Sequence, residues 1–193
     1  MRKDAQITVS GFGIRSDKLR LMNATKNFAR TAPGHVYSPQ RPQFMARRLH
    51  SEDGGQSLSA QLATKGDEVR AKYGPNIGWK EVLRILEDRS CVLYPCEVRF
   101  DADLLLAGEF AHSVPKGPKP EEGFTIFVHP CFATQLSALP YLVLYQLALV
   151  TCGSAVSPDD AETFGCHVLD LPQDQYFQVL CELAEQLGGD EMI

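Results

Sequence analysis

The sequence lacks a hydrophobic run long enough to span a bilayer, and its N-terminus lacks the apolar core of a secretory signal. Its most apolar stretch, residues 140–152, is 13 residues long. A membrane-spanning helix takes about 20 residues. We therefore expect no membrane span and a location in the cytoplasm.

Cysteine patterns that indicate zinc knuckles or disulfide frameworks are also missing. None of the six cysteines belongs to a close Cys-x-x-Cys pair, which zinc knuckles use. A reducing compartment keeps thiols free, and small free thiols are common in protein cores. We therefore expect six free thiols, and these are Cys91, Cys96, Cys131, Cys152, Cys166 and Cys181.

Basic residues are scarce in the second part of the chain, and acidic residues are scarce in the first. Residues 1–75 hold 13 Lys and Arg against 6 Asp and Glu, whereas residues 76–193 hold 6 against 18. Before residue 75 no apolar period is sustained, and Pro and Gly recur. We predict a basic, mostly irregular N-terminal arm over 1–75, with a short strand at 6–9 and a helix near 59–72. An acidic globular domain then covers 76–193.

The arm has several interpretations. Residues 1–50 contain ten basic residues and only Asp4 and Asp17 as acids. That composition is typical of a mitochondrial presequence, which would place the protein in the mitochondrial matrix. A second interpretation is that Met45 is the true start. If the arm is retained, it is solvated, pairs with the acidic domain, or binds nucleic acid, anionic lipid or a transport receptor.

Apolar spacing predicts a helix over residues 79–88, with Trp79, Val82, Leu83 and Leu86 on its buried face. Runs of β-branched and aromatic residues predict strands, of which the last should be mostly buried. The expected strands cover residues 91–94, 97–100 and 124–129. A turn or short helix is expected at 101–109, and an irregular Pro- and Gly-rich loop at 113–123.

Three helices are expected after the last strand. The first, residues 139–152, is apolar on nearly every face, which is typical of a buried central helix. The second begins at the N-cap Ser157, followed by Pro158. The third begins near Pro172 and ends at residues 188–189. The order predicts an α+β fold in which a small sheet packs against the central helix and two further C-terminal helices.

Gln146 is the only amide in the predicted central helix. A buried amide without partners costs about 1–3 kcal/mol, so we expect it to be hydrogen-bonded. One interpretation is a packing role, in which it bonds neighbouring backbone or a tyrosine hydroxyl. The other places it on the wall of a pocket.

The order of strand, buried helix and acidic helix over residues 124–172 resembles a minimal zincin-type metallopeptidase domain. The resemblance implies that Tyr145 and Leu149 stand where the zinc-binding histidines would be, that Gln146 replaces the catalytic glutamate, and that Glu162 matches an acidic third ligand. Only Glu162 is chemically competent. The resemblance thus implies a metal-free relative without peptidase activity, whose candidate pocket comprises Tyr145, Gln146, His129 and Glu162.

Other sites remain open in the sequence. His129, Cys131 and Glu162 are candidate metal ligands. For nucleophilic chemistry, Cys131 or Cys152 could pair with His129 or His167. Cys131 is the better candidate, because Cys152 lies at a helix C-terminus, where the dipole disfavours a thiolate.

Because no catalytic constellation is complete, we expect a non-catalytic domain that binds another protein and needs no cofactor. One alternative is a metal-binding protein or a metal-dependent hydrolase. Another is nucleic-acid binding through residues 1–50, with an affinity that falls steeply with salt. Glu109, His112 and Asp103, near the predicted loop, could line a surface cleft.

Overall fold

The structure is a computed structural model that describes residues 57–188; the strand expected at residues 6–9 lies outside this range. The described part contains five α-helices and a three-stranded sheet. The helices are α3 (Leu58–Tyr73), α4 (Trp79–Glu87), α5 (Leu139–Cys152), α6 (Pro158–Leu169) and α7 (Gln173–Gly188). The strands are β1 (Cys96–Phe100), β2 (Ala111–Pro115) and β3 (Phe124–Val128).

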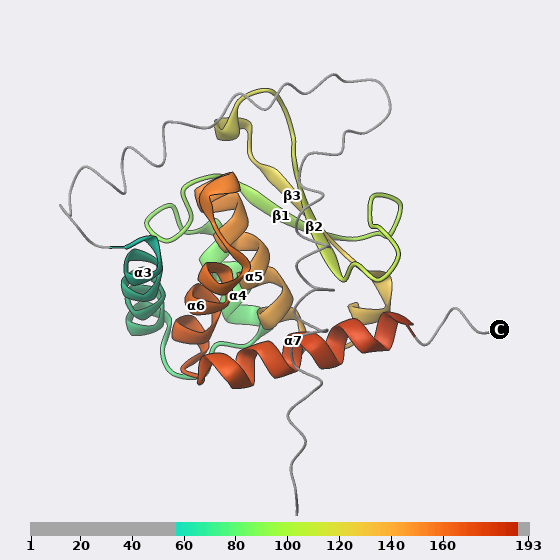
Figure 1. The fold of residues 1–193 in the computed structure, drawn as a ribbon. Coiled ribbons are helices and arrows are strands. Elements are labelled where there is room, and N and C mark those ends of the chain that lie inside the picture. The colour runs from blue at the N-terminus through green and yellow to red at the C-terminus, as the bar shows by residue number, and fades with distance from the viewer. Residues whose placement is uncertain (1–56, 189–193) are drawn as a thin grey trace, which may run out of the picture.

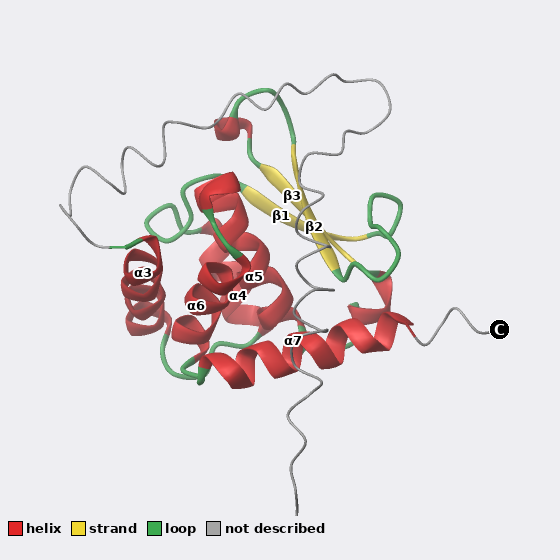
Figure 2. Cartoon of the chain, in the orientation of Figure 1, coloured by secondary structure: helices red, strands yellow, loops and turns green. Residues whose placement is uncertain are grey.

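Helix α5 lies in the core, as its composition predicts. Every residue of α5 except Tyr141 and Thr151 is buried. The helix contacts β2 and β3 on one side, and α4, α6 and α7 on others. Figures 1 and 2 show the helices gathered on one side of the sheet. The predicted α+β fold, with a small sheet on a buried central helix and two C-terminal helices, is confirmed.

The sheet has the strand order β1-β3-β2, so the most apolar strand is the central one. Strand β3 pairs in parallel with β1 and antiparallel with β2, and its Ile126 lies between Val98 and Ser113. Because β1 and β3 are parallel, both of their carboxyl ends meet the start of β2 at one edge of the sheet. The segments after these two strands are therefore brought together there.

Two local predictions are wrong. Residues 91–94 form a turn, not a strand, because the backbone N–H groups of Cys91 and Val92 both donate to the carbonyl of Asp88. The predicted irregular loop begins too early, because β2 continues to Pro115. Proline is tolerated at this point because it ends an edge strand.

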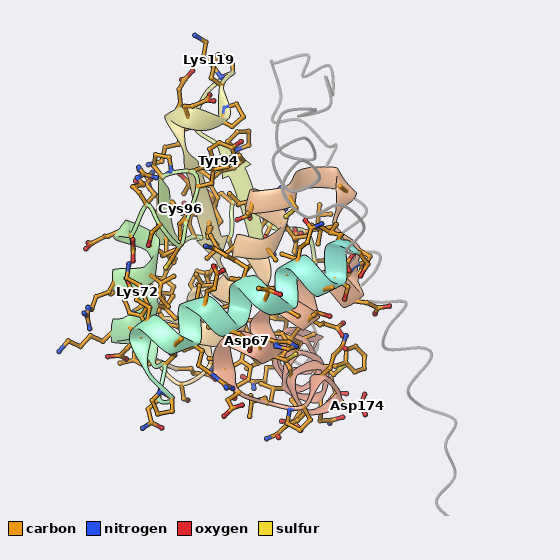
Figure 3. All side chains as sticks on the ribbon, turned by 90° about the vertical axis from the view of Figure 1, so that its left-hand side faces the viewer. Asp67, Lys72, Tyr94, Cys96, Lys119 and Asp174 are labelled. Atoms are coloured by element: carbon orange, nitrogen blue, oxygen red, sulfur yellow. The ribbon has the colours of Figure 1, made fainter. Side chains whose placement is uncertain are left out.

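The folded unit begins upstream of residue 76, so the predicted boundary of the arm is corrected here. Helix α3, expected within the arm, packs against α6 and buries Leu62 and Val69. The two helices approach so closely at Gly66 that an added Cβ would lie 2.6 Å from the Cβ of His167. Asp67, labelled on α3 in Figure 3, pairs with the same histidine at 3.0 Å.

Asp88 joins the C-terminal ends of α3 and α4. Its carboxylate pairs with Lys72, accepts a hydrogen bond from the Tyr73 hydroxyl at 2.7 Å and accepts another from the Ser90 N–H at 2.9 Å. The hydrogen bond from Lys72, followed by those from Tyr73 and Ser90, holds the pKa of Asp88 well below its ordinary value. Partial burial, and then the bond to Asp88, raise the pKa of Tyr73 to about 12.

A first prediction concerns the contact between α3 and α6. Gly66→Ala should lower the free energy of unfolding by about 1–3 kcal/mol, because the new methyl group meets backbone as well as the His167 side chain. Urea unfolding of the full chain measures the loss. Thr64→Ala, on the exposed face of the same helix, is the control and should stay within about 0.5 kcal/mol of the parent. Equal stability of the two variants would show that α3 is not docked.

A second prediction concerns pH. Because the folded-state pKa of Asp88 is depressed, its contribution to stability is present above its ordinary pKa near 4 and is lost as the pH falls towards the folded value. The parent protein should lose stability between about pH 5 and about pH 2, and Asp88→Asn should reduce the slope over that window. Urea midpoints across this range provide the measurement. An unchanged slope would mean that the contacts of Asp88 do not form in solution.

Candidate functional site

Gln146 links the central helix to an edge strand. Its Oε1 accepts a hydrogen bond from the Ser113 hydroxyl at 2.6 Å, and its Nε2 donates to the Ala111 carbonyl at 2.9 Å. All three residues are buried. The predicted backbone partner is confirmed, and the hydroxyl is that of a serine, not a tyrosine. Both polar atoms of the amide are used to fix β2 on α5.

Tyr145 and Glu162, two further residues of the predicted pocket, lie near each other between α5 and α6. The Tyr145 ring packs edge-on against Phe110, with the ring centroids 6.0 Å apart. Among the described residues, its buried hydroxyl has no hydrogen-bond partner. Burial, and then the negative charge of Glu162, raise the pKa of Tyr145. Glu162 is itself buried and accepts a hydrogen bond from the amide of Gln173 at 3.4 Å.

His129, the fourth residue of the predicted pocket, pairs with Cys131. His129 Nδ1 lies 3.0 Å from Cys131 Sγ and also accepts the backbone N–H of Cys131 at 3.4 Å. Both residues are half-buried and lie in the turn that follows β3. Of the cysteine–histidine pairs that the sequence left open, the structure brings together Cys131 and His129. Cys152 is buried in α5, where burial raises its thiol pKa to about 11, and His167 pairs with Asp67 instead.

The candidate metal ligands do not converge. Across residues 57–188, no three His, Cys, Asp or Glu side chains form a group that could hold a metal ion. His129 and Cys131 are thus a two-residue pair, and Glu162 belongs to the buried layer between α5 and α6.

A second histidine pair lies at the same edge of the sheet. His112 Nδ1 is 3.3 Å from a carboxylate oxygen of Glu109, whose other oxygen accepts the Leu106 N–H at 3.0 Å. Glu109, expected as a possible lining residue of a surface cleft, is only 5% exposed. The Glu-x-x-His spacing is the signal that could have indicated this pair. The N–H of His129 donates to the Phe110 carbonyl, so both pairs border the carboxyl end of β3.

An apolar surface lies on α4 and the end of β1. Leu83, predicted to be buried, is 42% exposed, whereas Ile85 is fully buried in its place. The correction follows from helix geometry, because the buried side of α4 centres on Val82, Ile85 and Leu86, and Leu83 lies about 100° away from Val82. We call Trp79, Leu83 and Phe100 the α4 patch.

The α4 patch is continuous across two elements. The rings of Trp79 and Phe100 meet edge-on with centroids 6.5 Å apart, and Leu83 lies one helical turn beyond Trp79. Phe100 is 39% exposed. Each member is followed or preceded in sequence by an exposed cation, and these are Lys80, Arg84 and Arg99.

Among the described residues, Lys and Arg are absent from α6 and α7. No Lys or Arg follows Lys119 in the whole chain. The basic side chains of the described part therefore lie on α3, α4, the strands and their loops, whereas α6 and α7 carry only acids among their charged groups other than His167. Figure 3 shows Lys119 and Asp174 at opposite ends of the view.

No family model, curated protein or solved structure matches this chain. Within the described residues, none of the helices combines the length and apolar character needed to cross a membrane.

A third prediction tests whether Gln146 is a packing residue. Gln146→Ala should cost about 2–4 kcal/mol of stability, because it leaves a cavity and removes a partner from both Ser113 and Ala111. Ser113→Ala should cost about 1–3 kcal/mol. Chemical unfolding monitored by circular dichroism measures both.

Two variants serve as controls for this prediction. Gln178→Ala, on the exposed side of α7, should change stability by no more than about 0.5 kcal/mol. Tyr145→Phe removes a buried hydroxyl that has no partner among the described residues, and should leave stability unchanged or raise it. A harmless Gln146→Ala would contradict the packing role.

Proposed function

We propose that this chain is a non-catalytic α+β domain that binds another protein through the α4 patch. The observation that carries the proposal is that two exposed apolar side chains, Leu83 and Phe100, adjoin the Trp79 ring from two different elements. Exposed apolar groups that adjoin one another and are bordered by charge are typical of interaction surfaces.

The chemistry of the patch specifies the partner. Burying a leucine or phenylalanine side chain contributes about 1.5–3 kcal/mol, so three such groups provide the apolar part of a contact. Lys80 and Arg84 follow Trp79 and Leu83 on α4 and are exposed, whereas Arg99 points to the opposite face of β1 from Phe100 and pairs with Glu97 at 3.1 Å. The partner is therefore a protein segment that presents apolar side chains flanked by carboxylates, because complementary charge raises the association rate and selects the partner.

We further propose that this non-catalytic domain has a zincin-like arrangement of β3, α5 and α6. Its support is the order β3, α5, α6 and the proximity of Tyr145 to Glu162 at two of the matched positions. With Gln146 committed to β2, the matched helix contributes to packing. We place the domain in the cytoplasm on the sequence evidence alone.

The alternatives have less support. A metal-dependent hydrolase needs several donors around one ion, and residues 57–188 gather no group of three. Nucleic-acid binding through residues 1–50 concerns a segment outside the described range.

A fourth prediction tests the α4 patch. Full-length protein with Leu83→Glu, used as bait in a lysate of the native host, should lose at least about tenfold of the captured partner, because a carboxylate is placed in the apolar contact and repels acids. Leu136→Glu is the matched control, since Leu136 is 55% exposed and lies outside the patch. Quantitative mass spectrometry measures capture, and circular dichroism checks that both variants are folded.

The outcomes separate clearly. Loss of the same protein with Leu83→Glu but not with Leu136→Glu supports the proposal. Lys80→Glu or Arg84→Glu should also weaken capture of that protein. Equal capture by all variants, or no capture by the parent above empty beads, would overturn it.

A further inference from the structure

The pair formed by His129 and Cys131 is not part of the α4 patch; Cys131 packs against the core on one side, and the His129 ring meets Phe132 edge-on. It lies in the short turn Pro130–Phe132 after β3, and its two polar atoms are 3.0 Å apart. An imidazole nitrogen at this distance can accept the thiol proton, which is how reactive cysteines are activated. The Cys131 residue is half-buried, so part of it reaches the surface.

The other five cysteines have different surroundings. Burial raises the thiol pKa of Cys96 and Cys152 to about 11 each. Burial also raises the pKa of Cys91 and Cys166. Cys181 is buried within α7. Within the described residues, the sulfur of Cys131 lies against the imidazole nitrogen of His129.

We propose that Cys131 is a modification site at which a small-molecule disulfide forms a mixed disulfide with the protein, and that His129 acts as the proton acceptor.

The exchange is balanced without a further oxidant. The proton of Cys131 Sγ passes to His129 Nδ1, and the thiolate attacks one sulfur of the small disulfide. A new S–S bond forms as the old one breaks, and the displaced thiolate leaves with the electron pair. It then takes the proton from the imidazolium. The sulfur of Cys131 is oxidised and the leaving sulfur is reduced.

The modification would act on a defined contact. The side-chain amide of Gln135 donates both to the Cys131 carbonyl at 3.3 Å and to the Gln186 side chain on α7 at 3.1 Å. A group attached to Cys131 would stand beside this link between the turn and the end of α7.

A fifth prediction tests the site with cystamine as the probe. Full-length protein is treated at neutral pH, and the labelled cysteines are identified by peptide mapping over time. Cys131 should be labelled first, at least about tenfold faster than Cys96 and Cys152, because a thiol with a pKa near 11 holds very little thiolate at that pH. Cys131→Ser should remove the fast phase.

His129→Ala should slow the labelling of Cys131 at least about fivefold and leave the other thiols unchanged. His167→Ala is the matched control, because His167 pairs with Asp67 and should not alter the rate at Cys131. Faster labelling of the buried cysteines in a variant would show that the variant is unfolded. In that case the order of labelling in the parent protein decides whether Cys131 is the most reactive thiol. A Cys131 that reacts no faster than Cys91, or whose rate is unaffected in a folded His129→Ala variant, would overturn the proposal.

Discussion

The architecture depends on the burial of helix α5, which presents apolar side chains on nearly every face. Such a helix is stable in water only when other elements cover it on all sides. The sheet covers one side, while α4, α6 and α7 cover others. The only amide of the helix, Gln146, faces β2 and satisfies the hydroxyl of Ser113 and the carbonyl of Ala111. The same contact thus holds an edge strand in place and removes the cost of a buried amide.

The layers of helices around α5 include α3, which charge composition alone would assign to the N-terminal arm. Helix α6 packs on α5, and α3 packs on α6 with Gly66 at the closest approach. The contact of Asp67 with His167 and the ion pair of Arg70 with Asp170 border this interface between the helices. The boundary between basic and acidic composition at residue 76 therefore does not coincide with the start of the folded domain at α3. Charged residues lie on the surface, whereas apolar contacts determine the core.

Strong periodic patterns made α4, β3 and the three C-terminal helices predictable, down to the Ser157 cap and the end at Gly188. Strand β2 was not, because its five residues include a proline and little β-branching. The exposure of Leu83 depends on how α4 is rotated against its neighbours, which spacing alone does not fix. At the site, the sequence could not decide whether Cys131 or Cys152 meets His129 or His167, because such pairing depends on the fold, and the burial of Glu109 likewise arises from tertiary contacts.

The buried amide of Gln146 is used in packing. The groups that we propose for binding and for thiol chemistry, the α4 patch and Cys131, reach the surface. The central claim is that α3 and α5 belong to one cooperative unit built around α5. Native-state hydrogen exchange of the full chain tests it most directly. The account predicts that amides of α5 and β3 exchange only on global unfolding, and that α3 is protected together with α6. Free exchange throughout α3, or rapid exchange within α5, would contradict it.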